Sequence, residues 1–223
     1  MPRHPRVAPG GMVFHTLNRG NARADLFRKA GDFEAFERLM LEAMRRSPIR
    51  LLAYCLMHNH WHMILWPEHD GQLSEFLRWL SMTHSQRLHA HRHTAGAGHI
   101  YQGRFKSFPV QEDEHLLAVL RYVERNALRA NLARRAEEWR WCSLWRRVNG
   151  VTDGLLSDWP VEVPKDWVRI VNAPQSEPEV EALRRSVVRG TPFGSDAWRQ
   201  RTARKLGLEF TLRPRGRPRE KVV

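Results

Sequence analysis

Two histidines, His60 and His62, stand on either side of one large apolar residue inside an apolar run of the sequence. Side chains alternate between the two faces of a β-strand, so both imidazoles are expected on one face while Trp61 packs on the other. At a separation of about 6 to 7 Å, two imidazoles on a rigid strand can reach the same divalent metal ion. The spacing alone is a weak motif, because a strand with two partly buried, hydrogen-bonded histidines has the same pattern.

A second set of reactive side chains lies further along the chain, on a stretch with helical periodicity. Residues 112–131 are predicted to form a helix whose buried stripe consists of Leu116, Leu120, Val123 and Ala127. Tyr122 and Asn126 are one turn apart and share a half-exposed flank, with Arg129 at the next turn. A tyrosine on a helix flank is usually structural. Beside a metal held by two histidines, however, its phenol becomes a candidate nucleophile toward phosphorus.

The charge of the chain favours a polyanionic partner. Among 223 residues, 37 Lys and Arg outnumber 24 Asp and Glu, which gives a formal net charge of +13. Such an excess attracts nucleic acid first and an anionic membrane surface second. No apolar run approaches the roughly 20 residues of a membrane helix, and the basic start leads into no signal-peptide core. We therefore expect no membrane partner. Cys55 and Cys142 are too few for a disulfide framework, so the sequence predicts reduced thiols in a cytoplasmic protein.

The elements that must position these residues are short strands and amphipathic helices. Periodicity predicts strands over 12–18, 49–57, 60–66 and 101–110. A helix that Asp32 caps and Ser47-Pro48 closes precedes the second strand, and another helix covers residues 73–88. Only His58 and Asn59 separate the second and third strands, which are therefore expected to form a hairpin.

Three regions follow from the composition along the chain. They are a domain over 1–150 that contains the candidate catalytic residues, a linker over 151–176 that is rich in Gly, Pro and Asp, and a basic helical extension over 177–223. The extension is expected to contain helices over 179–189 and 195–206, the second capped by Ser195. Proline, glycine and repelling charges predict a disordered arm at the end, with DNA-binding residues Arg213, Arg215, Arg217 and Arg219. Its Arg-Gly-Arg-Pro sequence resembles an AT-hook core, and a non-specific phosphate-binding tail is the alternative.

The predicted strand over 101–110 interleaves aromatic and basic residues. Such a strand suits a surface that contacts phosphates through Arg104 and Lys106 and stacks on unpaired bases, although an edge strand with solvated basic residues is nearly as good an interpretation. Before it, five histidines between residues 84 and 99 resemble a metal cluster, but they surround a flexible loop, and a supply of positive charge beside DNA explains them better.

These motifs together resemble a known family. His60-Trp61-His62 is similar to the histidine-hydrophobe-histidine motif of the HUH endonucleases, and Tyr122 followed by Asn126 resembles their single-tyrosine transposase helix. The stretch Gly98-His99-Ile100-Tyr101-Gln102-Gly103-Arg104-Phe105-Lys106-Ser107 and the tail resemble the REP-associated tyrosine transposases, bacterial relatives of insertion-sequence transposases. The resemblance covers about residues 10 to 150. It departs from the family at His58, where proline is common.

The resemblance implies an α+β fold of the ferredoxin-like or RRM-like kind, with helices against one face of an antiparallel sheet. It also implies that His60, His62 and Asn126 bind Mg²⁺ or Mn²⁺, and that Tyr122 attacks single-stranded or hairpin DNA to form a 5′-phosphotyrosine bond. Arg125 and Arg129 on the same helix are then expected to bind the DNA. Such a protein would act at the bacterial nucleoid.

Two other functions remain open at this point. A non-catalytic regulator that binds hairpin DNA would keep the fold without the chemistry. A metal-dependent hydrolase that uses water would leave Tyr122 dispensable. Whether the protein is a monomer or a homodimer is left open as well.

Overall fold

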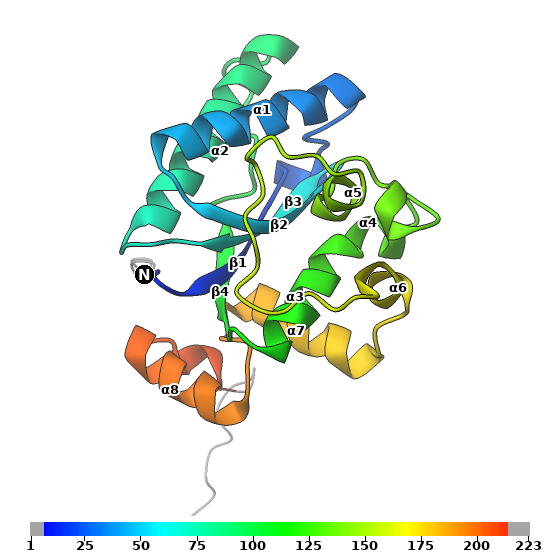
Figure 1. Ribbon diagram of the computed structural model, residues 1–223. Helices are drawn as coiled ribbons and strands as arrows, with labels where there is room; N and C mark the ends of the chain where they lie inside the picture. Colours follow the sequence, from blue (N-terminus) through cyan, green and yellow to red (C-terminus); the bar gives the residue numbers. More distant parts are fainter. Residues whose placement is uncertain (1–6, 214–223) are drawn as a thin grey trace, which may run out of the picture.

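A four-stranded antiparallel sheet forms the centre of the computed structural model, which describes residues 7–213 (Figure 1). The strand order is β2-β3-β1-β4, with β1 (Val13–Arg19), β2 (Arg50–Met57), β3 (His60–Trp66) and β4 (Lys106–Val110). The longer helices are α1 (Ala30–Arg46), α2 (Gln72–Arg92), α3 (Glu114–Glu124), α7 (Glu177–Arg189) and α8 (Asp196–Leu206). The shorter ones are α4 (Asn126–Arg129), α5 (Ser143–Val148), α6 (Trp167–Asn172), and the 3-10 turns η1 (Asn21–Arg23), η2 (Ala136–Glu138) and η3 (Glu209–Thr211). The predicted α+β class is confirmed.

The β2–β3 hairpin has the predicted form. Met57 pairs with His60 across the two-residue turn, and β3 covers the residues that the sequence predicts. On its other side β3 pairs with β1, which places Leu17 opposite His62. The histidine pair therefore lies on a central strand, held by hydrogen-bonded neighbours on both sides.

β4 is shorter than the strand predicted over 101–110. Tyr101 pairs only through an isolated bridge with Gly20, and continuous pairing with β1 begins at Lys106, after a bend over 102–104. Tyr101 and Phe105 are buried in the core, whereas the basic side chains of the segment are exposed. The aromatic residues of this stretch therefore stabilise the fold and are not free to stack on bases.

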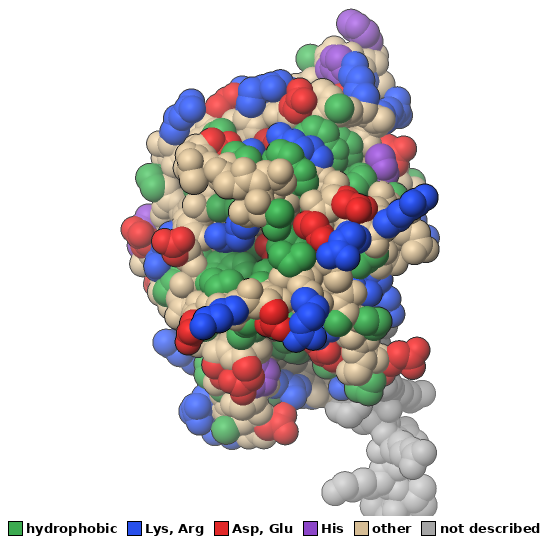
Figure 2. All heavy atoms as spheres, turned by 45° about the vertical axis from the view of Figure 1, so that its right-hand side comes forward, with side chains coloured by type: hydrophobic (Ala, Val, Ile, Leu, Met, Phe, Trp, Pro, Cys, Tyr) green, Lys and Arg blue, Asp and Glu red, His purple; other side chains and the backbone are tan. Residues whose placement is uncertain are grey.

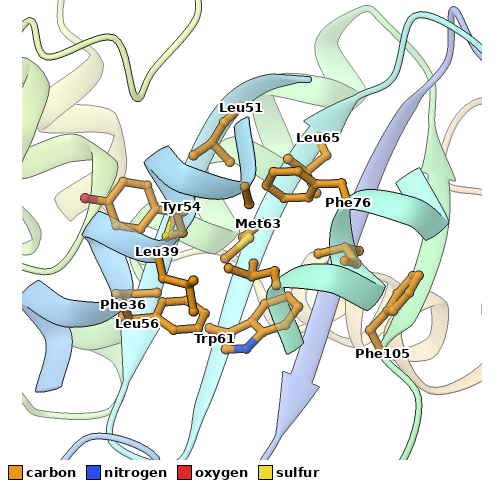
Figure 3. Close-up of a cluster of buried hydrophobic side chains, with 14 of the residues drawn as sticks. Phe36, Leu39, Leu51, Tyr54, Leu56, Trp61, Met63, Leu65, Phe76 and Phe105 are labelled. Carbon is orange, nitrogen blue, oxygen red and sulfur yellow. The ribbon is translucent and has the colours of Figure 1, made fainter. Parts of the chain in front are cut away.

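Helices cover both faces of the sheet, which corrects the expectation of helices on one face (Figure 1). α1 and α2 cover the face that carries Trp61 and Met63, and Figure 3 shows Phe36 and Phe76 packed over these residues. α3 covers the other face, against Ile64. The sequence feature that indicates two covered faces is the near-continuous apolar character of β2 and β3. A strand that faces water on one side would alternate apolar and polar residues.

Two helix predictions also need correction. α1 has Lys29 at its N-cap, and the carboxylate of Asp32 lies inside the first turn, where it accepts the backbone N–H of Arg28. The helix predicted over 112–131 is interrupted at Arg125, which separates α3 from α4. The predicted cap of α8 is confirmed, because the Ser195 hydroxyl accepts the backbone N–H of Trp198.

A buried ionic network joins α1, β2 and α5. The Tyr54 hydroxyl donates to Glu37 Oε1 at 2.5 Å and accepts from Arg146 Nε at 2.7 Å. The same guanidinium donates to Glu37 Oε2 at 3.3 Å and to Asp153 Oδ2 at 2.7 Å. The Arg146 and Glu37 side chains are only 5% and 6% exposed, and the second cation near Glu37, Arg140 at 3.5 Å, is 39% exposed, so Arg146 is the main compensation for the buried Glu37 charge.

Arg146→Met is expected to destabilise the protein by about 3 to 5 kcal/mol, because it leaves the Glu37 carboxylate buried without its main cation. Urea denaturation measures the effect. The matched control is Arg87→Met, whose partner Glu42 lies at 2.7 Å in an ion pair that is 54% and 38% exposed; we expect a loss of about 1 kcal/mol or less. Equal losses in the two variants would contradict the structural role of the network.

Residues 151–176, for which the composition predicts a linker, are packed along the sheet and α3. The indole N–H groups of Trp159 and Trp167 donate to the Leu52 carbonyl and the Glu124 carboxylate, and both rings are largely buried. α7 packs against α3 and β4, and Phe193 forms a bridge with the end of β4. The helix α7 of the predicted extension therefore packs on the same core as the sheet. The domain limits at 150 and 176 stay predictions. No helix within residues 7–213 combines the length and apolar character needed to cross a membrane.

Candidate active site

His60 and His62, two of the three predicted metal ligands, lie on the face of β3 that α3 covers. Their imidazole ring centroids are 5.2 Å apart, and Trp61 points into the opposite core layer. His60 Nδ1 lies 2.6 Å from Asn59 Oδ1, and His62 Nδ1 lies 2.8 Å from His15 Nε2. Because the Nδ1 atom of each ring is engaged in a hydrogen bond, the Nε2 atoms of His60 and His62 remain as the candidate metal-binding atoms.

Burial keeps these imidazoles neutral. It lowers the pKa of His60 to about 4, with a further contribution from Arg19 and Arg129. It lowers the pKa of His62 well below its ordinary value, and that of His15 to about 3. A metal-binding imidazole must be unprotonated at the ligating nitrogen, so near pH 7 no proton has to be displaced from a charged ring before a metal binds.

Tyr122 lies next to this histidine pair. Its ring centroid is 5.9 Å from that of His62 and 6.3 Å from that of His15. Tyr122 and Asn126 are only 6% and 5% exposed, which corrects the half-exposed flank expected from the helix pattern. The reason is that this flank of the helix packs against the sheet histidines His15 and His62, while Arg129 lies over the Tyr122 ring.

Arg129 links the tyrosine to the asparagine. Its guanidinium carbon lies 4.1 Å from the Tyr122 ring centroid, and its Nη2 donates to Asn126 Oδ1 at 3.0 Å. Two buried donors nearby, Asn126 Nδ2 and Arg129 Nη1, have no hydrogen-bond partner among the described residues. Buried donors without a partner are costly, so this pair favours an acceptor such as a phosphate oxygen at this position.

One cavity of about 800 Å³ is lined by His60, His62, Tyr122 and Asn126. Its rim includes the predicted DNA-binding residues Arg104 and Lys106, together with Arg184 and Arg189 of α7, which the sequence patterns did not single out. No acidic residue in the described part of the chain lines this cavity, whereas basic and acidic side chains are interspersed on the molecular face shown in Figure 2. A cavity whose charged residues are all cations concentrates an anionic ligand.

Not every predicted residue reaches this cavity. The guanidinium of Arg125 is directed away from it and donates through Nη1 to the carbonyls of Val171 and Asn172, so Arg125 anchors the C-terminal end of α6. Arg213 is exposed near the end of the described chain. Arg215, Arg217 and Arg219 lie outside the described residues.

A separate cluster of possible metal ligands lies at the start of α3. The ligand atoms of Asp113, Glu114 and His115 are within 4.8 Å of one another. The Asp113 carboxylate already accepts the backbone N–H of His115 as the helix cap, and none of the three lines the cavity. This cluster is explained by capping and is not part of the candidate active site.

Comparisons with known proteins give a family and a fold for this chain. The family model described as "Transposase IS200 like" matches residues 10–126, which is more than half of the chain and includes all four site residues. A solved structure described as a REP-associated tyrosine transposase bound to a REP hairpin has the same fold, with a TM-score of 0.55 and 22% identity; the match covers 74% of this chain and 94% of that chain. No match was found among curated proteins. From the extent of the family match, we conclude that the chain belongs to the IS200-like transposase family.

Proposed function

We propose that this protein is a metal-dependent single-strand DNA endonuclease and strand transferase that works through a 5′-phosphotyrosine intermediate. The observation that carries the proposal is the convergence of His60, His62, Tyr122 and Asn126 on one cation-lined cavity. They come from β3, α3 and α4, so the sequence pattern alone does not require them to meet. Since one chain supplies all of them, the proposed site is complete in a monomer.

The donor set fits a divalent cation. His60 Nε2 and His62 Nε2 are free of the hydrogen bonds that engage each Nδ1 atom, and Asn126 Oδ1 has a second lone pair besides the one that accepts from Arg129. Two imidazoles and one amide oxygen suit Mn²⁺ slightly better than Mg²⁺, while Mg²⁺ is the more abundant ion in cells. When bound, such a cation supplies Lewis-acid polarisation of the scissile phosphate.

The side chains of this protein then have separate roles. The Tyr122 hydroxyl gives up its proton and its oxygen forms a bond to phosphorus, while the bond from phosphorus to the 3′-oxygen breaks and the departing 3′-oxygen gains a proton to become a hydroxyl. Arg129 Nη1 and Asn126 Nδ2 offer hydrogen bonds to the phosphate oxygens. Attack by a free 3′-hydroxyl reverses the step, so joining needs no ATP because the phosphodiester energy is kept in the tyrosine bond.

Hairpin-forming repeat DNA is the proposed substrate. The support is the solved relative of the same fold, whose description names a REP hairpin. The charge of the cavity suits a single-stranded flank, while Arg104 and Lys106 at its rim are placed to contact phosphates. Such DNA would be met at the bacterial nucleoid, in the cytoplasm.

A labelled-DNA assay tests the chemistry and its polarity. Hairpin DNA with single-stranded flanks is incubated with the protein and Mn²⁺ and run on a denaturing protein gel. DNA labelled at its 3′ end should give a labelled protein adduct, while DNA labelled at its 5′ end should give only a shorter free strand. Binding without cleavage would favour the regulator, and cleavage without adduct the water-using hydrolase.

The C-terminal arm is expected to strengthen DNA binding through charge. Removing residues 212–223 takes away four Arg, one Lys and one Glu, a net loss of four positive charges. At about 0.7 to 0.9 per phosphate contact, truncation should flatten the plot of log K against log[salt] by roughly 3 units. Cleavage of saturating substrate should persist, because the residues of the proposed site all precede residue 131.

The matched control for truncation keeps the length of the arm. Replacing its four arginines by glutamine should flatten the salt slope as truncation does, if the contacts are to phosphates. A minor-groove hook would instead show a loss selective for A·T-rich duplex flanks that lower salt rescues little. Unchanged affinity and slope on every DNA would exclude the arm from the interface.

A further inference from the structure

His15 lies behind the proposed metal site and has no role in the chemistry described above. It occupies the middle of β1, where it pairs with Ile64 of β3 and Phe108 of β4. Its side chain is 1% exposed, stacks on the Phe108 ring at a centroid distance of 4.7 Å, and does not line the cavity. A polar ring in this position needs a hydrogen-bond partner, because an unpaired polar group is costly in an apolar layer.

The partner of His15 is His62. His15 Nε2 lies 2.8 Å from His62 Nδ1. The two nitrogen atoms share one hydrogen bond, so one donates and the other accepts. If His62 Nδ1 donates, the lone pair of its Nε2 faces the cavity and can bind a metal. If it accepts, a neutral His62 carries its proton on Nε2 and cannot bind. The tautomer of His62 is thus coupled to that of His15, a residue on another strand.

His60 shows the same arrangement with a different acceptor. Its Nδ1 lies 2.6 Å from Asn59 Oδ1, and an amide oxygen can only accept, so the His60 proton is held on Nδ1. In both histidines, a group outside the cavity engages Nδ1 and leaves Nε2 toward it. Support of this kind typically changes metal affinity by about 10- to 100-fold.

We infer that His15 is a positioning residue for the metal site: its Nε2 accepts the proton of His62 Nδ1 and so holds the His62 Nε2 lone pair toward the cavity. The inference rests on the proposed function, since it assigns His62 as a metal ligand. It adds β1 to the elements that build the site. His15 does not line the cavity, and its side chain is linked to the metal site by its hydrogen bond to His62.

Mn²⁺ affinity of the full-length protein without DNA, measured by calorimetry, tests this role. His15→Phe keeps the stacked ring but removes the acceptor, and we expect it to bind Mn²⁺ about 10- to 100-fold more weakly than the parent. His15→Gln places an amide oxygen near the position of Nε2 and should restore affinity to within about threefold of the parent, because only the acceptor is needed.

His84→Phe is the matched control. His84 is also a buried histidine with a hydrogen-bonded Nδ1, but its partner is the Tyr101 hydroxyl on the α1/α2 face of the sheet. We expect parental Mn²⁺ affinity for this variant. If His15→Phe bound Mn²⁺ as the parent does, or if His15→Gln were as weak as His15→Phe, the acceptor role would be overturned.

A measurement on the unchanged protein covers the case in which His15→Phe does not fold. Nitrogen-15 NMR of the imidazoles should show His62 protonated at Nδ1 in the metal-free protein, and a proton on His62 Nε2 would overturn the inference. Failure of the parent protein to bind Mn²⁺ would overturn the proposed function together with this inference. If the parent protein bound Mn²⁺ and His15→Phe bound it equally well, only this inference would be overturned.

Discussion

Tyr122→Phe is expected to bind hairpin DNA with parental affinity and to lose the covalent adduct by roughly 10⁴-fold or more, because it lacks only the attacking oxygen. The phenylalanine ring can keep the packing below the Arg129 guanidinium, which lies 4.1 Å from the Tyr122 ring centroid. A gel that separates protein from protein–DNA adduct measures the loss, and binding in EDTA measures affinity without cleavage.

The two other tyrosines provide the comparison. Tyr54 donates to Glu37 in the buried network, and Tyr101 is hydrogen-bonded to His84, so both hydroxyls lie in the core layer away from the cavity. Tyr101→Phe should therefore form adduct at the parental level when it is folded. A parental adduct level in Tyr122→Phe would assign the nucleophile to one of these tyrosines and refute the proposed mechanism.

His60→Ala and His62→Ala are each expected to reduce cleavage by at least about 100-fold, since each removes a proposed metal ligand. DNA binding in EDTA should survive, because affinity rests mainly on contacts between basic side chains and phosphates. Asn126→Ala should have a smaller effect, as water can replace one neutral oxygen ligand. Cleavage rates across a range of Mn²⁺ concentrations separate lost affinity from lost chemistry.

His58→Ala is the matched control within the same hairpin. The His58 ring packs edge to face with Phe33 and Trp139, and its Nδ1 lies 3.1 Å from the Phe27 carbonyl oxygen, outside the cavity. DNA cleavage by His58→Ala should therefore keep the parental dependence on Mn²⁺ concentration. If substitution of His91 or His93 removed the metal dependence while His60→Ala did not, the metal would belong to the histidine-rich segment instead.

Some parts of the site follow from local sequence. A strand has a side-chain period of two, so His60 and His62 share one face wherever the strand is placed. The turn at His58-Asn59 fixes the hairpin and keeps both histidines on the strand directly after it. Tyr122 and Asn126 are one helical turn apart, and the break at Arg125 still leaves them on the same cavity wall.

Neighbouring arginines show where this local reasoning ends. Arg125 and Arg129 are one turn apart on the same stretch, and both were expected to bind DNA. The docking of α6 engages Arg125 through backbone carbonyls, whereas Arg129 remains in the cavity beside Tyr122. A helix pattern gives the direction of a side chain, but the element that covers it comes from elsewhere in the chain.

The sequence by itself determined the fold class, the histidine pair, the tyrosine and the positive charge, because strand alternation, helical spacing and composition are local properties. The tertiary structure alone decided that helices cover both faces of the sheet, that α7 lines the cavity with Tyr122, and that His15 reaches His62. His15 and His62 are 47 positions apart in the sequence, and Arg184 lies on a helix that begins well after α4. Contacts of this kind depend on strand register and helix docking, which the burial of apolar surface across the whole chain determines, and no periodicity within one segment records them.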